Sequence, residues 1–103
     1  MIRVTVLYPA QDTGHFDHDY YRSTHIPMVR QALGAALKRA SVEKGIGTIE
    51  PGKPAPFMAT GIMEFESAEA FAAAFGPHAA KVMGDIPNYT NVQPVVQIAE
   101  IIE

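Results

Sequence analysis

The order in which strand-like and helix-like segments follow one another is the feature that most restricts how this chain can fold. β-Branched residues that alternate with polar ones predict strands, whereas apolar residues three and four positions apart predict helices. The segments run in the order strand 2–8, helix 17–33, strands 37–47 and 57–65, a helix after Ser67, and strand 95–102. This βαββαβ order is typical of a ferredoxin-like α+β domain, with a four-stranded antiparallel sheet and two helices on one face.

Both predicted helices have recognisable ends. Asp17 is a favourable N-cap, and Phe16 and Tyr21 have the spacing of a hydrophobic staple around it. Gly34 is the predicted C-terminal cap, and Pro27 inside the segment predicts a kink or break. In the second helix, which Ser67 caps, the inner face is predicted to carry Phe71, Phe75, Val82 and Met83, with an interruption at 76–77.

The predicted strands carry apolar residues on both faces of the sheet. The first strand has Val4 and Val6 on one side and Leu7 on the other, and the last strand sets Val96 against Val95. A sheet covered on one face only should alternate more strictly. Since two helices cannot cover both faces, we expect a homodimer that packs sheet against sheet into an α+β barrel and leaves a cleft on each protomer.

The composition indicates one globular domain over residues 1–103, with 48% apolar and 18% charged residues. A net charge of −3 and scattered lysines and arginines argue against a nucleic-acid partner. No apolar run approaches the roughly 20 residues of a membrane span. Without cysteine the chain has no disulfide or thiolate, and a strand-like N-terminus in place of a signal peptide predicts a cytoplasmic location.

His25 is the candidate functional residue with the clearest sequence support. On a helix, Tyr21, His25, Met28 and Ala32 fall within about 60° of one another, so an imidazole shares the face of the apolar stripe. One interpretation is a core histidine whose ring nitrogens are satisfied by the backbone. The other is a cavity histidine that exchanges a proton near neutral pH, with Tyr21 holding a ligand or the imidazole ring.

The predicted pocket combines inward residues of the helices and sheet with two residues from the polar segment 85–94. Its members are Tyr21, His25, Met28, Phe65, Phe71, Phe75, Asn88 and Tyr89. Asn88 and Tyr89 could equally satisfy backbone groups of an irregular crossover. A catalytic histidine needs an orienting carboxylate, and Glu64 and Glu66 at a strand end are the candidates.

No motif for a metal or a cofactor is present. His15 and His18 stand three residues apart beside aspartates, but this spacing matches no strong metal signature, and a solvated loop is expected. The sequence also lacks a phosphate-binding loop and a flavin fingerprint. We therefore expect no bound metal and no cofactor.

The sequence resembles the EthD family of the dimeric α+β barrel superfamily. The resemblance is carried by Phe16-Asp17, Tyr20-Tyr21, His25-x-Pro27, Asp85-Ile86-Pro87-Asn88-Tyr89-Thr90-Asn91 and Gln93-Pro94. It implies a ferredoxin-like protomer that forms a barrel with its twin and holds a largely apolar pocket between sheet and helices. The family is named for a protein needed in bacterial degradation of an alkyl ether, which implies a possible partner oxidative enzyme.

Some EthD members are labelled reductases, and relatives include methylmuconolactone isomerases and fungal enzymes that act on polyketides. The resemblance implies that a histidine of the His-x-Pro type, here His25, serves as acid or base. The isomerases also rely on a cysteine, which this chain lacks.

Three functions remain open from the sequence, and whether the chain is an enzyme is one of the open questions. The first is an accessory or catabolic protein that binds an apolar or ring-containing small molecule around Tyr21 and His25. The second is a cofactor-independent enzyme of the isomerase, lyase, monooxygenase or reductase type, with His25 as general acid–base. The third is a dimerisation module without a ligand.

Overall fold

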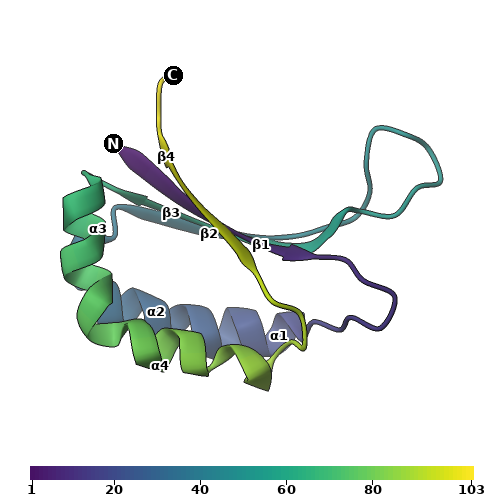
Figure 1. Cartoon of the computed structure of the whole chain (residues 1–103), viewed down its shortest axis with the longest axis horizontal. Coiled ribbons are helices and arrows are strands. Elements are labelled where there is room, and N and C mark those ends of the chain that lie inside the picture. Colours follow the sequence, from purple (N-terminus) through teal and green to yellow (C-terminus); the bar gives the residue numbers. More distant parts are fainter.

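The computed structural model describes residues 1–103 and contains one antiparallel sheet of four strands in the order β2-β3-β1-β4. The strands are β1 (Ile2–Pro9), β2 (Arg39–Lys44), β3 (Phe57–Phe65) and β4 (Val95–Glu100). All helices lie on one face of this sheet (Figure 1). The predicted ferredoxin-like fold is thereby confirmed. The second and last strands are shorter than predicted.

The first helical segment is continuous from His18 to Leu33 but changes its winding along the way. It consists of α1 (His18–Tyr20), a π-helical turn (Tyr21–His25) and α2 (Ile26–Leu33), followed by a 3₁₀ turn (Gly34–Ala36). The Asp17 carboxylate accepts from the Tyr20 N–H at 3.0 Å, as expected of an N-cap. Gly34 ends the segment with φ of 57°, a conformation that glycine adopts without a steric penalty.

The π-helical turn stands where the sequence predicted an interruption. The Ile26 N–H donates to the Tyr21 carbonyl, five residues back instead of four. Pro27 follows as the second residue of α2, directly after the widened turn, where an irregular backbone accommodates its missing N–H. The wide turn leaves Tyr21 and His25 both buried under the sheet, with their rings stacked at a centroid distance of 5.5 Å.

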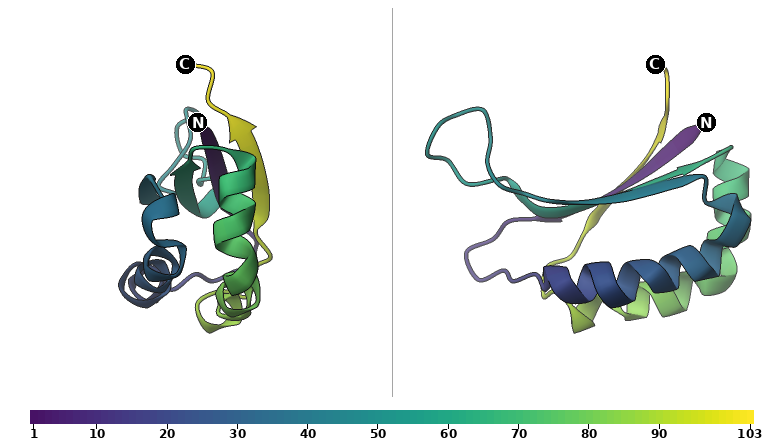
Figure 2. Two further views of the ribbon diagram at one scale, coloured as in Figure 1. Left: turned by 90° about the vertical axis from the view of Figure 1, so that its left-hand side faces the viewer. Right: turned by 180° about the vertical axis from the view of Figure 1, so that it is seen from behind.

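The second helical segment covers the remainder of the same sheet face. It consists of α3 (Ala68–Phe75), a 3₁₀ turn (Gly76–His78) at the predicted interruption, α4 (Ala79–Gly84) and a further 3₁₀ turn (Ile86–Asn88). The Ser67 hydroxyl accepts from the Ala70 N–H at 3.0 Å and confirms the predicted cap. The two helical segments run side by side below the sheet in both views of Figure 2.

The core between sheet and helices has two parts of different chemistry. At one end it is aliphatic apart from one aromatic ring, and its buried members are Val4, Val29, Leu33, Phe65 and Val82. At the other end it is built largely from tyrosines, and its buried members are Tyr8, Tyr21, Ala59 and Tyr89. The buried phenol hydroxyls therefore gather at the tyrosine end.

The opposite sheet face carries no helix. The strand registers place Thr5, Leu7 and Ile62 on this face, together with an ion pair between Arg3 and Glu64 at 2.9 Å. At the β4 edge, Val95 is half exposed, although it is a β-branched apolar residue. The face is therefore partly apolar, in agreement with the strand patterns.

A long loop, residues 45–56, joins β2 to β3 and extends away from the rest of the molecule (Figure 1). It carries Ile46 and Ile49, whose side chains are fully exposed. None of the helices is long and apolar enough to cross a membrane.

Replacing Phe65 by alanine should destabilise the fold strongly. Its ring is fully buried and packs edge-on against Phe71 at 5.0 Å, so the cavity left behind should cost about 3–5 kcal/mol in the free energy of unfolding. Urea unfolding of Phe65→Ala measures this loss. Ile49→Ala is the control, because an exposed loop residue should change the unfolding free energy by less than about 0.5 kcal/mol.

Candidate functional site

A cavity of about 310 Å³ lies between the sheet and the helices. Its walls are mainly aliphatic and aromatic, and the predicted pocket residues that line it are Tyr21, His25, Phe71, Phe75 and Tyr89. The sheet side of the cavity is formed by Val4, Val6 and Tyr8 of β1 and by Gly61 of β3. The cavity thus joins the aliphatic part of the core to the tyrosine part.

Three residues of the predicted pocket lie elsewhere. Phe65 points into the aliphatic core and is not part of the cavity wall. Met28 and Asn88 line a separate, open groove on the outside of the helices, beside Tyr20 and Asp85. Met28 packs partly against the aliphatic core but does not reach the cavity, because the π turn shifts the helical phase of α2 by one residue relative to the residues before it.

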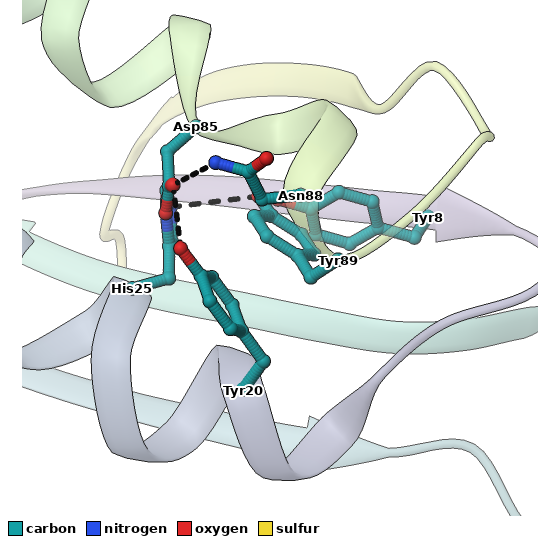
Figure 3. A network of polar contacts seen from close by, with 6 residues as sticks. All are labelled: Tyr8, Tyr20, His25, Asp85, Asn88 and Tyr89. Carbon is teal, nitrogen blue, oxygen red and sulfur yellow. Dashed lines mark hydrogen bonds and ion pairs between the residues drawn. The ribbon is translucent and has the colours of Figure 1, made fainter.

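The polar centre of the site is a pair formed by His25 and Asp85 (Figure 3). His25 comes from the π turn, and Asp85 caps the C-terminal end of α4. The imidazole Nδ1 lies 2.8 Å from Oδ2 of Asp85. The other carboxylate oxygen accepts from the Tyr20 hydroxyl and from the Asn88 side-chain amide, each at 2.8 Å.

These contacts fix the protonation of both partners near neutral pH. Partial burial raises the pKa of the Asp85 carboxyl, but hydrogen bonds from Asn88, His25 and Tyr20 outweigh it, and the pKa ends below its ordinary value. Burial lowers the pKa of His25, and the nearby carboxylate reverses only part of this effect. Asp85 is therefore ionised and His25 neutral. Because the carboxylate only accepts, Nδ1 carries the imidazole proton and Nε2 keeps its lone pair.

Tyrosine hydroxyls lie on the Nε2 side of the imidazole. The Tyr89 hydroxyl is 3.5 Å from Nε2, and the hydroxyls of Tyr89 and Tyr8 are 2.7 Å apart. Burial raises the pKa of Tyr8, Tyr21 and Tyr89, so all three remain neutral phenols at physiological pH. The site thus offers a neutral base beside neutral hydroxyls, at one end of an apolar cavity.

The predicted orienting carboxylates, Glu64 and Glu66, do not contact His25. Glu64 pairs with Arg3 on the far face of the sheet, and Glu66 lies exposed, 3.9 Å from Lys38. Asp85 takes the orienting position instead, which the sequence analysis missed. The one available signal was its place at the start of the polar segment 85–94.

Tyr8 is a further site residue that the sequence analysis missed, as is Tyr20, whose hydroxyl donates to Asp85. The alternation of Tyr8 with Val4 and Val6 marks it as inward-facing, but the pattern cannot distinguish a packing ring from a hydroxyl that meets Tyr89. The two histidines of the first loop have other contacts. The His18 ring lies 3.0 Å from the Met58 carbonyl, and the His15 N–H donates to Asn91. No group of three side chains suited to a metal ion is assembled in the structure.

The stability of the protein should fall as the pH drops below about 6.5. The pKa of His25 is lowered in the folded state, so the unfolded chain takes up this proton first, and stability is lost as the pH falls through the folded pKa. Urea unfolding between pH 8 and pH 5 measures the slope, and His25→Gln should remove part of it. An unchanged slope in His25→Gln would contradict the assignment of a buried neutral imidazole.

Comparison with known proteins supports one family. The family model described as "EthD domain" matches residues 13–93. An EthD-like protein from Ralstonia eutropha JMP134 is 43% identical, with a TM-score of 0.94 over 99% of this chain and 92% of the other. An ethyl tert-butyl ether degradation (EthD) family protein from Bacillus halodurans C-125 is 20% identical, with a TM-score of 0.67 over 99% of both chains.

A more distant solved structure, described as a dimeric ferredoxin-like protein of unknown function from Thermobifida fusca, shares the fold. Its identity is 17% and its TM-score 0.56, over 97% of this chain and 90% of that one. Comparison with curated proteins gave no match. The residues that the family model matches include His25, Asp85 and Tyr89. Because this model covers most of the chain and the Ralstonia protein is 43% identical, the chain belongs to the EthD family.

Proposed function

We propose that the protein binds an uncharged, apolar small molecule in the cavity and that His25 acts on it as a general acid–base catalyst. The observation that carries this proposal is the imidazole at one end of an apolar cavity, held through Nδ1 by the ionised Asp85 at 2.8 Å. The alternative is a carrier or accessory protein that binds the same kind of ligand without reacting with it. The experiments below distinguish the two.

The cavity favours an apolar and uncharged ligand. Its volume of about 310 Å³ lies at the lower end of the range of small-molecule sites. The polar groups at its tyrosine end are neutral, and an ion placed among them would lose its hydration without gaining a counter-charge. Arg30 also lines the cavity, but its guanidinium group is exposed to solvent and donates to the Ala40 carbonyl at 3.3 Å, so it is not a buried counter-charge for an anion.

The arrangement of Asp85 and His25 favours acid–base chemistry over simple packing. A histidine that only fills the core needs its nitrogens satisfied, and a backbone carbonyl would serve. Here a carboxylate fixes the tautomer and stabilises the imidazolium that forms when Nε2 accepts a proton. Two further donors, Tyr20 and Asn88, hold that carboxylate in position.

The proposed chemistry can be tested with 5-nitrobenzisoxazole, a neutral apolar compound whose ring opens to a coloured phenolate when a base removes its C–H proton. We expect the protein to accelerate this reaction. His25→Ala should lower the rate by roughly 10²–10⁴-fold, the usual value of a general base, and Asp85→Asn should lower it less. Glu64→Gln is the matched control, because this carboxylate lies on the far face of the sheet.

Binding is measured separately with the neutral fluorophore N-phenyl-1-naphthylamine. If His25→Ala binds the fluorophore as the wild type does and the wild type shows no ring opening, the protein is a carrier. If the wild type binds no apolar probe, the cavity is not a ligand site and the proposed function is wrong.

We further propose that two copies associate through the sheet face that carries no helix. Thr5, Leu7 and Ile62 lie on this face, and burying their apolar groups against a second copy would stabilise the pair. The distant relative from Thermobifida fusca is described as dimeric, which is in keeping with this arrangement.

Native mass spectrometry should therefore detect a dimer, and Leu7→Glu should shift it toward the monomer, because a buried carboxylate in the interface has no partner. Ala73→Glu, on the exposed side of α3, adds the same charge and should leave the dimer intact. A wild-type protein that remains monomeric at micromolar concentration would contradict the sheet-to-sheet interface. The same spectrum would reveal a small molecule that co-purifies with the protein.

A further inference from the structure

Gly61 stands in the middle of β3, paired with Val6 of β1 on one side and with Val42 of β2 on the other. A glycine inside a strand weakens it, because it contributes no side chain to the packing and loses more backbone entropy on folding. The backbone does not require glycine here, since only Gly34 and Gly52 have a positive φ. A strand glycine of this kind often marks a place where another group approaches the backbone closely.

The group that approaches Gly61 is the hydroxyl of Tyr21. A Cβ added to the glycine would overlap the Tyr21 oxygen, so any larger residue would displace it. The same Cβ would lie 3.7 Å from Cζ of the Tyr21 ring, which is an ordinary van der Waals distance. The missing side chain therefore makes room for one oxygen atom and not for the ring that carries it. Phenylalanine at position 21 would be compatible with alanine at position 61, whereas tyrosine is not.

The hydroxyl of Tyr21 is the one tyrosine hydroxyl without a hydrogen bond in the protein. Those of Tyr8 and Tyr89 lie 2.7 Å apart, and that of Tyr20 donates to a carboxylate. Every buried polar side-chain atom has a partner, so an unpartnered hydroxyl must border open space. Tyr21 is buried and belongs to the cavity wall, and the open space beside its hydroxyl is therefore the cavity.

Aromatic packing holds this hydroxyl at a fixed place relative to His25. The Tyr21 ring stacks on the imidazole at a centroid distance of 5.5 Å and an interplanar angle of 15°. Phe16 and Tyr8 pack edge-on against the Tyr21 ring at 4.9 Å and 5.7 Å. A polar group whose ring is held by packing loses little conformational freedom when it binds a ligand. The hydroxyl and the imidazole are thus two preorganised polar groups in one cavity.

We propose that Gly61 and Tyr21 form a specificity-determining pair, in which the glycine admits the hydroxyl and the hydroxyl binds an oxygen atom of the ligand. This inference rests on the proposed function and specifies which ligands the cavity selects. The neighbours of Gly61 in the cavity wall, Val6 and Val42, are apolar, so the hydroxyl is the group that can hydrogen-bond at this place.

The chemistry of a phenol indicates the class of ligand. A neutral phenol both donates and accepts, so it suits a carbonyl or a hydroxyl group. A pure hydrocarbon would cover the hydroxyl without offering it a partner, and leaving a buried polar group unpaired costs free energy. The preferred ligand is therefore an uncharged molecule with an apolar skeleton that carries a ketone or an alcohol oxygen.

The selection can be tested with two pairs of probes that differ at one oxygen. Acetophenone and α-methylstyrene exchange C=O for C=CH₂, and 1-phenylethanol and cumene exchange a hydroxyl for a methyl group. Displacement of N-phenyl-1-naphthylamine measures the Kd of each probe. The ratio of the hydrocarbon Kd to that of its oxygenated analogue should fall about five- to tenfold from the wild type to Tyr21→Phe in at least one pair, the value of one net hydrogen bond.

The outcomes of this experiment are distinguishable. Ratios that are the same in the wild type and in Tyr21→Phe for both pairs would overturn the proposed selection. The same conclusion follows if the fluorophore binds to the wild type and neither oxygenated probe displaces it. If neither the fluorophore nor any probe binds to the wild type, the proposed function itself fails.

The part of Gly61 is tested by combining two substitutions. Gly61→Ala alone should lower the urea midpoint of unfolding and shift the ¹H resonances of the His25 ring, because the new methyl group displaces the Tyr21 phenol that stacks on it. In the Tyr21→Phe background the same substitution should not lower the midpoint, because the obstructing oxygen is absent. Gly47→Ala is the matched control, since nothing lies within 4 Å of a Cβ there and its effect should be equal in both backgrounds.

An equal loss from Gly61→Ala with and without the Tyr21 hydroxyl would contradict the pairing, since the strand itself would then require the glycine. If Gly61→Ala alone does not fold, the double variant Gly61→Ala/Tyr21→Phe should still fold. A double variant that also fails to fold, while Tyr21→Phe folds, would overturn the proposal as well.

Discussion

The hydrogen bond between Asp85 and His25 is the interaction on which the arrangement of the site depends. It joins the end of α4 to the π turn of the first helical segment, across 60 positions of sequence. By fixing the proton on Nδ1 it leaves Nε2 as a hydrogen-bond acceptor, 3.5 Å from the Tyr89 hydroxyl, which itself lies 2.7 Å from that of Tyr8. One ionised carboxylate at the edge of the core thus sets the tautomer of the buried imidazole.

The aliphatic and tyrosine ends of the interior have different tasks. Val4, Val29 and Phe65 supply the tight packing that holds the helices on the sheet. The tyrosine end gives up some of this packing for hydroxyls that must satisfy one another, which costs stability unless the network is complete. Burial keeps both the phenols and the imidazole neutral, and Asp85 is the one counter-charge available when the imidazole takes up a proton.

Local physics made the fold predictable from the sequence, whereas the site required contacts between distant segments. Asp17, Ser67 and Gly34 act through their immediate neighbours, and helical phase brought His25 to the inner face. The partner of His25 could not be found in this way, because the pairing with Asp85 depends on how α4 lies against the first helix. Glu64, in contrast, could have been excluded as a partner of His25 from the sequence. Side chains alternate along a strand, so the neighbour of the inward-facing Phe65 must face away from the helices.

The π turn makes the length of its segment as important as its composition. It holds one residue more than the α-helical turn that it replaces. Deleting one residue from 22–24 would therefore let the helix close as an ordinary α-turn, with the segments before and after it still in phase. The widened turn that sets Tyr21 against His25 would be lost, so the change would fall on the site while the flanking helices keep their packing. The loop at 45–56 carries no such constraint, so length changes should be tolerated very unevenly along this chain.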